Sequence, residues 1–195
     1  MTLLGGFARN FRDALTWLET AAPSSPDTFY RINQPRVGLY DSASDTGSVP
    51  LSTGVMTAVR IKLFAGDVIT NISFRSGQTA AATPTNYWVA LYSNAGTPAL
   101  LAQSADQTTT AWAANTTKTL ALSAPVTISK TDYYWAAINV TASTVPSLLG
   151  TIGVAPIVTG EANLAVSSGS SLAGTAPTTL ATPTQKNFVP YVVLN

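Results

Sequence analysis

Residues 86–104, NYWVALYSNAGTPALLAQS, consist of two apolar runs that flank a turn rich in Gly, Asn, Ser and Pro. Within the first run, Tyr87, Val89 and Leu91 share one face of a strand, and Trp88, Ala90 and Tyr92 share the other. A strand with one wet face would alternate apolar with polar residues. The stretch therefore predicts a pair of strands, the first covered on both faces by the protein's second layer, by a sugar or by a neighbouring subunit. The N-terminal helix, the long C-terminal loop or another subunit could supply the second cover, and we expect a neighbouring copy or a virion partner.

Side chains that alternate between two faces, as in a strand, are also found on both sides of this stretch. Residues 55–63 and 68–74 alternate apolar with polar, and the short AGD connection between them predicts a hairpin. The other runs that read as strands are 117–123, 125–129, 132–141 and 187–195. Short strands separated by Gly, Asn, Pro and Thr turns, without helices between them, predict an all-β fold. The expected architecture is an antiparallel, jelly-roll-like β-sandwich.

The first 22 residues follow a helical period instead. One stripe of the predicted helix is apolar and carries Phe7, Phe11, Leu15 and Leu18, with charged and hydroxyl side chains opposite. We expect an N-terminal amphipathic helix at 1–22 that docks the chain to a particle or joins copies of it, with a trimer favoured. A helix folded back on its own domain is the alternative. Prolines mark a linker at 23–36, and residues 37–195 would form the sandwich domain.

Residues 155–187 are rich in Gly, Ser, Thr, Ala and Pro, a composition typical of flexible linkers. Apolar residues nevertheless recur in the segment at Leu164, Val166, Leu172 and Leu180. The final strand must also return to the sheet after it. We therefore expect a long, mostly ordered loop that lies over the sandwich or over a neighbour.

Composition argues against several function classes. Charged residues make up 10% of the chain, against about 25% in typical domains, and the net charge of +1 includes no basic run that could neutralise nucleic acid phosphates. The chain has no Cys and no His, which removes thiol and imidazole catalysis, disulfides and the common zinc sites. No stretch reaches the roughly 20 apolar residues of a membrane span. We expect neither nucleic acid nor membrane as a partner.

An enzyme with this composition would depend on carboxylates, for example on the acid–base pair of a glycoside hydrolase. Most of the Asp and Glu residues fall in predicted turns, where such side chains accept backbone hydrogen bonds. The segment DSASDTG at 41–47 has two acids at calcium-loop spacing but lacks the glycine and the final Glu of such a loop. The sequence therefore predicts no catalytic residue, no metal site and no cofactor.

Aromatic side chains suggest another function, because a ring can stack on the C–H face of a sugar. Aromatic residues within strands are expected in the core. Trp112 lies instead in the polar segment TTTAWAANTT at 108–117, which makes it the best candidate for contact with a glycan. The alternative is a tryptophan that closes one end of the sandwich.

Four segments together resemble a sandwich domain of minor tail and other virion proteins of tailed phages that infect actinobacteria. They are GVMTAVRIKLFAGDVITNISF (54–74), TPTNYWVALYSNAGTPALLAQSAD (83–106), TTAWAANTTKTLAL (109–122) and DYYWAAINVTASTVPSLLG (132–150), which cover about half of the chain. The resemblance implies a non-enzymatic virion protein, made in the host cytoplasm, whose sandwich faces outward as a minor tail or adhesion module. Its partners would be virion proteins, other copies of the chain and host cell-wall glycan. The alternatives are a capsid decoration or head-fibre protein and a free carbohydrate-binding module.

Overall fold

The computed structural model describes residues 48–152 and 164–195. The chain divides into two units, Met1–Pro35 and Arg36–Asn195, and every described residue belongs to the second. The predicted helix at 1–22, including Phe7, Phe11, Leu15 and Leu18, lies outside the described residues, as does the acidic segment at 41–47.

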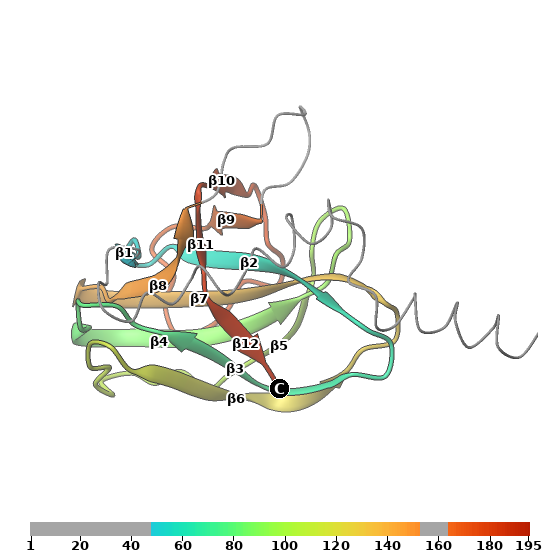
Figure 1. Ribbon diagram of the computed structural model, residues 1–195, viewed down its shortest axis with the longest axis horizontal. Helices are drawn as coiled ribbons and strands as arrows, with labels where there is room; N and C mark the ends of the chain where they lie inside the picture. The colour runs from blue at the N-terminus through green and yellow to red at the C-terminus, as the bar shows by residue number, and fades with distance from the viewer. Residues whose placement is uncertain (1–47, 153–163) are drawn as a thin grey trace, which may run out of the picture. The chain divides into compact units, whose positions relative to one another are not determined.

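The described residues form strands joined by turns and loops, and every strand pairing among them is antiparallel (Figure 1). In chain order the strands are β1 (Ser48–Pro50), β2 (Met56–Leu63), β3 (Val68–Arg75), β4 (Ala82–Tyr92), β5 (Leu100–Gln103), β6 (Thr117–Thr127), β7 (Asp132–Thr144), β8 (Ser147–Ile152), β9 (Ala165–Ser168), β10 (Thr184–Lys186), β11 (Phe188–Pro190) and β12 (Val192–Leu194). The all-β, antiparallel prediction is confirmed for this part of the chain.

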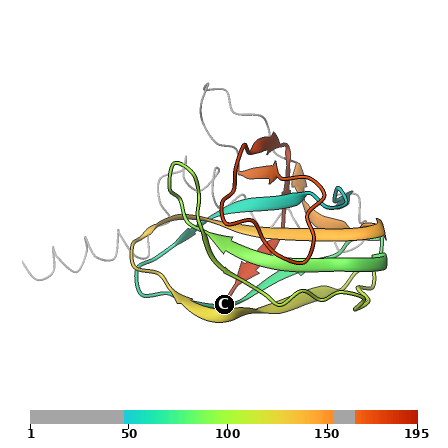
Figure 2. The same ribbon diagram turned by 180° about the vertical axis from the view of Figure 1, so that it is seen from behind.

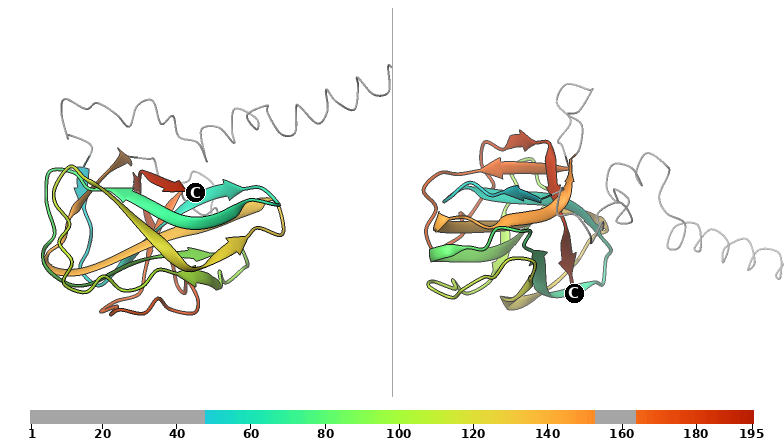
Figure 3. Two further views of the ribbon diagram at one scale, coloured as in Figure 1. Left: turned by 90° about the horizontal axis from the view of Figure 1, so that it is seen from below. Right: turned by 60° about the vertical axis from the view of Figure 1, so that its left-hand side comes forward.

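The strands form three sheets. The largest has six strands in the order β10-β9-β2-β7-β4-β5, and two smaller sheets have the orders β12-β3-β6 and β1-β8-β11. The six-stranded sheet and the β12-β3-β6 sheet form two layers (Figure 3). Inward side chains of both layers, such as Val89 of β4, Ile138 of β7 and Phe74 of β3, belong to one buried apolar cluster. Burial of this shared surface is the main favourable contribution to folding.

β2 and β3 do not form the predicted hairpin. β2 pairs with β7 and β9, whereas β3 pairs with β6 and β12 in the other layer. The connection is still tight, because the Asp67 amide donates to the Phe64 carbonyl at 3.0 Å and Gly66 adopts a φ of +98°. The hairpin prediction was wrong because alternation shows which face of a strand is buried, not which strand lies beside it. A short turn can connect two layers as well as two neighbours.

The pair of strands predicted at 86–104 is present. β4 pairs with β5 on one side and with β7 on the other, so β4 is an inner strand of the six-stranded sheet. The Ser93 amide donates to the Ala99 carbonyl at 2.9 Å and closes the loop between β4 and β5. Each residue from Tyr87 to Tyr92 is at most 1% exposed, so both faces of β4 are covered.

Candidate functional site

Trp112, the predicted glycan contact, is buried. Its side chain is 1% exposed, its ring centroid lies 6.0 Å from that of Tyr87, and its Nε1 donates to the Thr116 carbonyl at 3.3 Å. An indole without an exposed face cannot stack on a sugar. The structure therefore corrects this prediction, because Trp112 belongs to the buried apolar cluster shared by the two layers.

The second cover of β4 comes from the chain itself. Residues 169–183, which connect β9 to β10, cross the outer face of the six-stranded sheet, and we call them the strap (Figure 2). Buried or partly buried strap residues, namely Leu172, Ala176 and Leu180, pack in one cluster with the outward side chains of β4 and β7, which include Trp88, Tyr92 and Trp135. The strap thus supplies a third layer over the aromatic strip of β4.

Hydrogen bonds hold the strap on this strip. Trp88 Nε1 donates to the Ala173 carbonyl at 2.7 Å, and the Tyr92 hydroxyl donates to the Pro177 carbonyl at 2.9 Å. The Ala176 amide donates to Gln103 Oε1 at 2.8 Å. A buried indole N–H or phenol O–H requires an acceptor, and the strap provides one for Trp88 and one for Tyr92. Burial in this layer raises the pKa of the Tyr92 phenol.

This arrangement corrects the expectation that a neighbouring copy or a virion partner covers the outer face of β4. The cover is a Gly, Ser and Thr-rich segment of the same chain, far downstream of the strand that it protects. Apolar residues on both faces of β4 are therefore no argument for association of this unit.

Three connections gather at one end of the two main sheets, which we call the loop end (Figure 1). They are residues 64–67 between β2 and β3, 93–99 between β4 and β5, and 128–131 between β6 and β7. The Gly66 amide donates to the Ile128 carbonyl at 2.8 Å, and the Ala65 amide donates to Thr131 Oγ1 at 3.0 Å. These bonds fix the first and third connections to each other.

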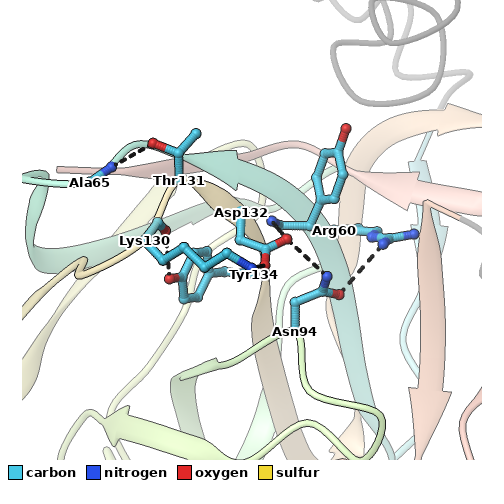
Figure 4. A network of polar contacts seen from close by, with 8 residues as sticks. Arg60, Ala65, Asn94, Lys130, Thr131, Asp132 and Tyr134 are labelled. Carbon is cyan, nitrogen blue, oxygen red and sulfur yellow. Dashed lines mark hydrogen bonds and ion pairs between the residues drawn. The ribbon is translucent and has the colours of Figure 1, made fainter.

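Asp132 forms the centre of a polar network at the loop end (Figure 4). Its Oδ1 accepts hydrogen bonds from the Tyr133 amide at 2.8 Å and from Asn94 Nδ2 at 3.1 Å, and its Oδ2 pairs with Lys130 Nζ at 3.1 Å. The Tyr133 amide, followed by Lys130, holds the pKa of this carboxyl below its ordinary value. The network links the loop after β4 to the first residues of β7.

Arg60 of β2 extends this network over two aromatic rings. Its guanidinium carbon lies 4.6 Å from the ring centroid of Tyr133 and 5.8 Å from that of Trp135, distances at which a cation is attracted to an aromatic face. Its Nη2 lies 3.5 Å from Asn94 Oδ1, at the limit of a hydrogen bond (Figure 4). The sequence placed Arg60 on the polar face of its strand, but it could not show that β7 lies alongside.

The rim of the loop end exposes apolar and cationic side chains. Phe64 is 42% exposed and Val68 is 51% exposed, while Lys62 Nζ lies 5.5 Å from the Phe64 ring centroid. The side chain of Lys130 is also largely exposed, although its Nζ pairs with Asp132. The loop end therefore combines a rigid polar interior with a mixed outer surface.

The carboxylates in the described part of the chain stabilise local structure. Asp67 Oδ2 accepts from the Phe64 amide at 2.9 Å across its turn. Asp106 accepts from the side chain of Asn86 and from the Tyr87 amide, at 2.5 and 2.9 Å. Asp67, Asp106 and Asp132 thus each accept a hydrogen bond from a backbone amide, as expected for acids in turns.

No protein-family model matches this chain, and no curated protein matches it significantly. Within residues 48–152 and 164–195, no group of three or more His, Cys, Asp or Glu side chains could hold a metal ion. The same residues contain no helix with the length and apolar character needed to cross a membrane.

Proposed function

We propose that the chain is a non-enzymatic structural protein of a tailed-phage virion that displays a jelly-roll-like β-sandwich on the particle surface as a minor tail or adhesion module. The observation that supports this most is the strap. The second unit closes both faces of its central strand with its own residues, so it can stand apart from a neighbour without exposing a large apolar surface. The segments that resemble phage virion proteins supply most of β2 to β7, which belong to the two main layers, and the first residues of β8.

In this proposal the predicted helix at 1–22 is the attachment element. Its apolar stripe of Phe7, Phe11, Leu15 and Leu18 docks on a tail protein or packs with the same stripe of other copies, with a trimer favoured. The protein is made in the host cytoplasm and acts in the virion. It uses no cofactor, and its partners are virion proteins and host cell-wall glycan.

Incorporation into particles tests the attachment role. A chain without residues 1–22 should keep its β-rich circular dichroism spectrum but disappear from purified particles. Leu15→Asp places a charge on the apolar stripe and should reduce incorporation at least tenfold, whereas the matched variant Thr16→Asp on the polar side should incorporate normally. Normal incorporation of the truncated chain would overturn the proposal.

The location of the protein on the particle decides between its two virion roles. Electron microscopy of particles that carry a labelled copy should show the label on the tail. A label on the head would instead support the alternative, a capsid decoration or head-fibre protein that uses the same module and anchor.

A further inference from the structure

A polar pocket with a volume of about 300 Å³ lies beside β9 and β10, where the strap begins and ends. Its lining includes Ser167 and Ser168 of β9, Gly169 and Ser170 at the start of the strap, Thr182 near its end, and Thr184 of β10, which pairs with Ser167. Val55, which precedes β2, adds one apolar wall. The pocket is thus at the opposite end of β2 from Phe64 and the loop end.

The chemistry of the lining restricts the ligand. Five of the seven lining residues carry a hydroxyl, and none is charged. A hydroxyl both donates and accepts hydrogen bonds, so this surface complements a ligand with hydroxyls of its own. The lining offers no carboxylate that could hold a metal ion and no cationic side chain that could pair with an anion. The volume is at the lower end of the range for ligand pockets, which suits a small ligand.

Several of these hydroxyls are available to a ligand. Ser168 Oγ donates to the Ala181 carbonyl at 2.5 Å and is used within the protein. The side chains of Ser170, Thr182 and Thr184 make no hydrogen bond to another described residue, and all three are exposed. The hydroxyls of Ser170, Thr182 and Thr184 thus have no partner among the described residues, whereas those of Ser167 and Ser168 donate to backbone carbonyls.

The backbone on both sides of the pocket is held in an unusual conformation. Gly169 has a φ of +77° and Thr182 has a φ of +42°. A threonine with positive φ is rare, because its branched side chain crowds the backbone, and such a residue persists only where the surrounding structure fixes it. A Cβ at Gly169 would lie only 2.9 Å from Leu172 Cδ1, so the strap packs closely against this wall. The pocket is therefore formed before a ligand arrives.

We infer that this pocket binds a neutral sugar residue of a glycan, with its hydroxyls bonded to Ser170, Thr182 and Thr184 and one C–H face against Val55. This sugar site deepens the proposed function. It rests on that function in one respect, because the proposed function names a glycan as the partner of the displayed module. It also moves the glycan contact away from Trp112, which is buried.

Titration of the full-length chain with simple sugars tests the inference. The probes are glucose, galactose and N-acetylglucosamine, with glucuronate and glucose 6-phosphate as charged comparisons, each followed by amide chemical shifts at up to tens of millimolar. At least one neutral sugar should shift the amide signals of Gly169, Ser170 and Thr184, and the charged sugars should bind more weakly. Thr184→Val, which removes one exposed hydroxyl, should weaken binding about fivefold.

Two further variants complete the test. Ser170→Trp fills the pocket and should abolish the shifts, whereas Thr127→Val, an exposed threonine of β6, should leave binding unchanged. Absence of shifts with every neutral sugar, equal binding of charged sugars, or shifts confined to the loop end would overturn the inference. Because this assay does not involve particles, it can fail while the incorporation experiment succeeds, and the reverse also holds.

Discussion

Asn139 of β7 is fully buried, yet neither its amide nitrogen nor its amide oxygen has a hydrogen-bond partner among the described residues. It lies opposite Trp88 of β4, on the face that the strap covers. A buried polar group without a partner costs about 1–3 kcal/mol. We predict that Asn139→Leu, which keeps the approximate size of the side chain, raises the free energy of unfolding by about 1 kcal/mol in urea denaturation.

The matched control is Asn86→Leu. Asn86 Nδ2 donates to Asp106, so the same substitution there removes a hydrogen bond to a carboxylate and should lower the free energy of unfolding. Destabilisation by Asn139→Leu comparable to that by Asn86→Leu would show that the Asn139 amide is satisfied in solution.

Asp132 makes the stability of the loop end depend on pH. Its pKa in the folded chain lies below the ordinary value of 3.8, because the Tyr133 amide and Lys130 favour the charged carboxylate. As the pH falls, the unfolded chain therefore takes up this proton before the folded chain does. The stabilisation by the Asp132 carboxylate is complete well above pH 3.8 and is lost as the pH falls through the pKa of Asp132 in the folded chain. Because Asp132 is partly exposed, the effect is at most about 1 kcal/mol.

Urea denaturation across this pH range measures the effect. The unfolding free energy of the wild type minus that of Asp132→Asn should be constant well above 3.8 and should shrink below it. Lys130→Met removes the interaction of Lys130 with Asp132, which lowers the pKa of that carboxyl less than the Tyr133 amide does. The substitution should therefore reduce the pH dependence of stability only in part. A difference that does not change with pH would contradict this assignment.

At the scale of the elements, the strap is the feature whose loss should affect the fold most widely. Leu180 is 1% exposed and packs in the cluster beneath the strap, whereas Leu101 of β5 is 42% exposed. Leu180→Ala should lower the free energy of unfolding by about 2–5 kcal/mol, because it leaves a cavity. Leu101→Ala should change it by less than about 0.5 kcal/mol.

Tryptophan fluorescence reports whether the strap stays in place. Trp88 donates to the strap carbonyl of Ala173, so partial release of the strap should shift its emission to longer wavelength in Leu180→Ala but not in Leu101→Ala. Equal effects of the two substitutions would mean that the strap is not needed to cover β4.

The limits of sequence reasoning are clearest at this scale. Alternation identified β2 and β3, because it follows directly from strand geometry, and uninterrupted apolar runs beside turn residues identified β4 and β7. Neither pattern identified the partners of β2 or gave information on the cover of β4. Leu172 and Leu180 indicated that the strap lies over the sandwich or over a neighbour, but they did not show that it covers the aromatic strip of β4. Trp112 was misplaced because it lies in a largely polar segment of the sequence, whereas in the structure it packs in the apolar cluster.

At the scale of the whole molecule, the strap changes where association is expected. Both faces of β4 are closed by residues of the same unit, so the second unit does not need another copy to bury them. Under the proposed function, self-association then depends on the predicted helix and its stripe of Phe7, Phe11, Leu15 and Leu18. In that proposal, the predicted anchor and the described module are separable parts of one chain, joined by the predicted Pro-containing linker at 23–36.

Light scattering coupled to size-exclusion chromatography tests this separation. The full chain should elute as an oligomer, with a trimer as the expected form, and residues 36–195 should elute as a folded monomer. Full-length Leu15→Asp should also be monomeric, because a charge on the apolar stripe opposes helix packing, whereas Thr16→Asp should retain the oligomer. If residues 36–195 associate as strongly as the full chain, the contact lies in the second unit despite its internal cover. A monomeric full chain would leave the stripe as a surface for docking to a different virion protein.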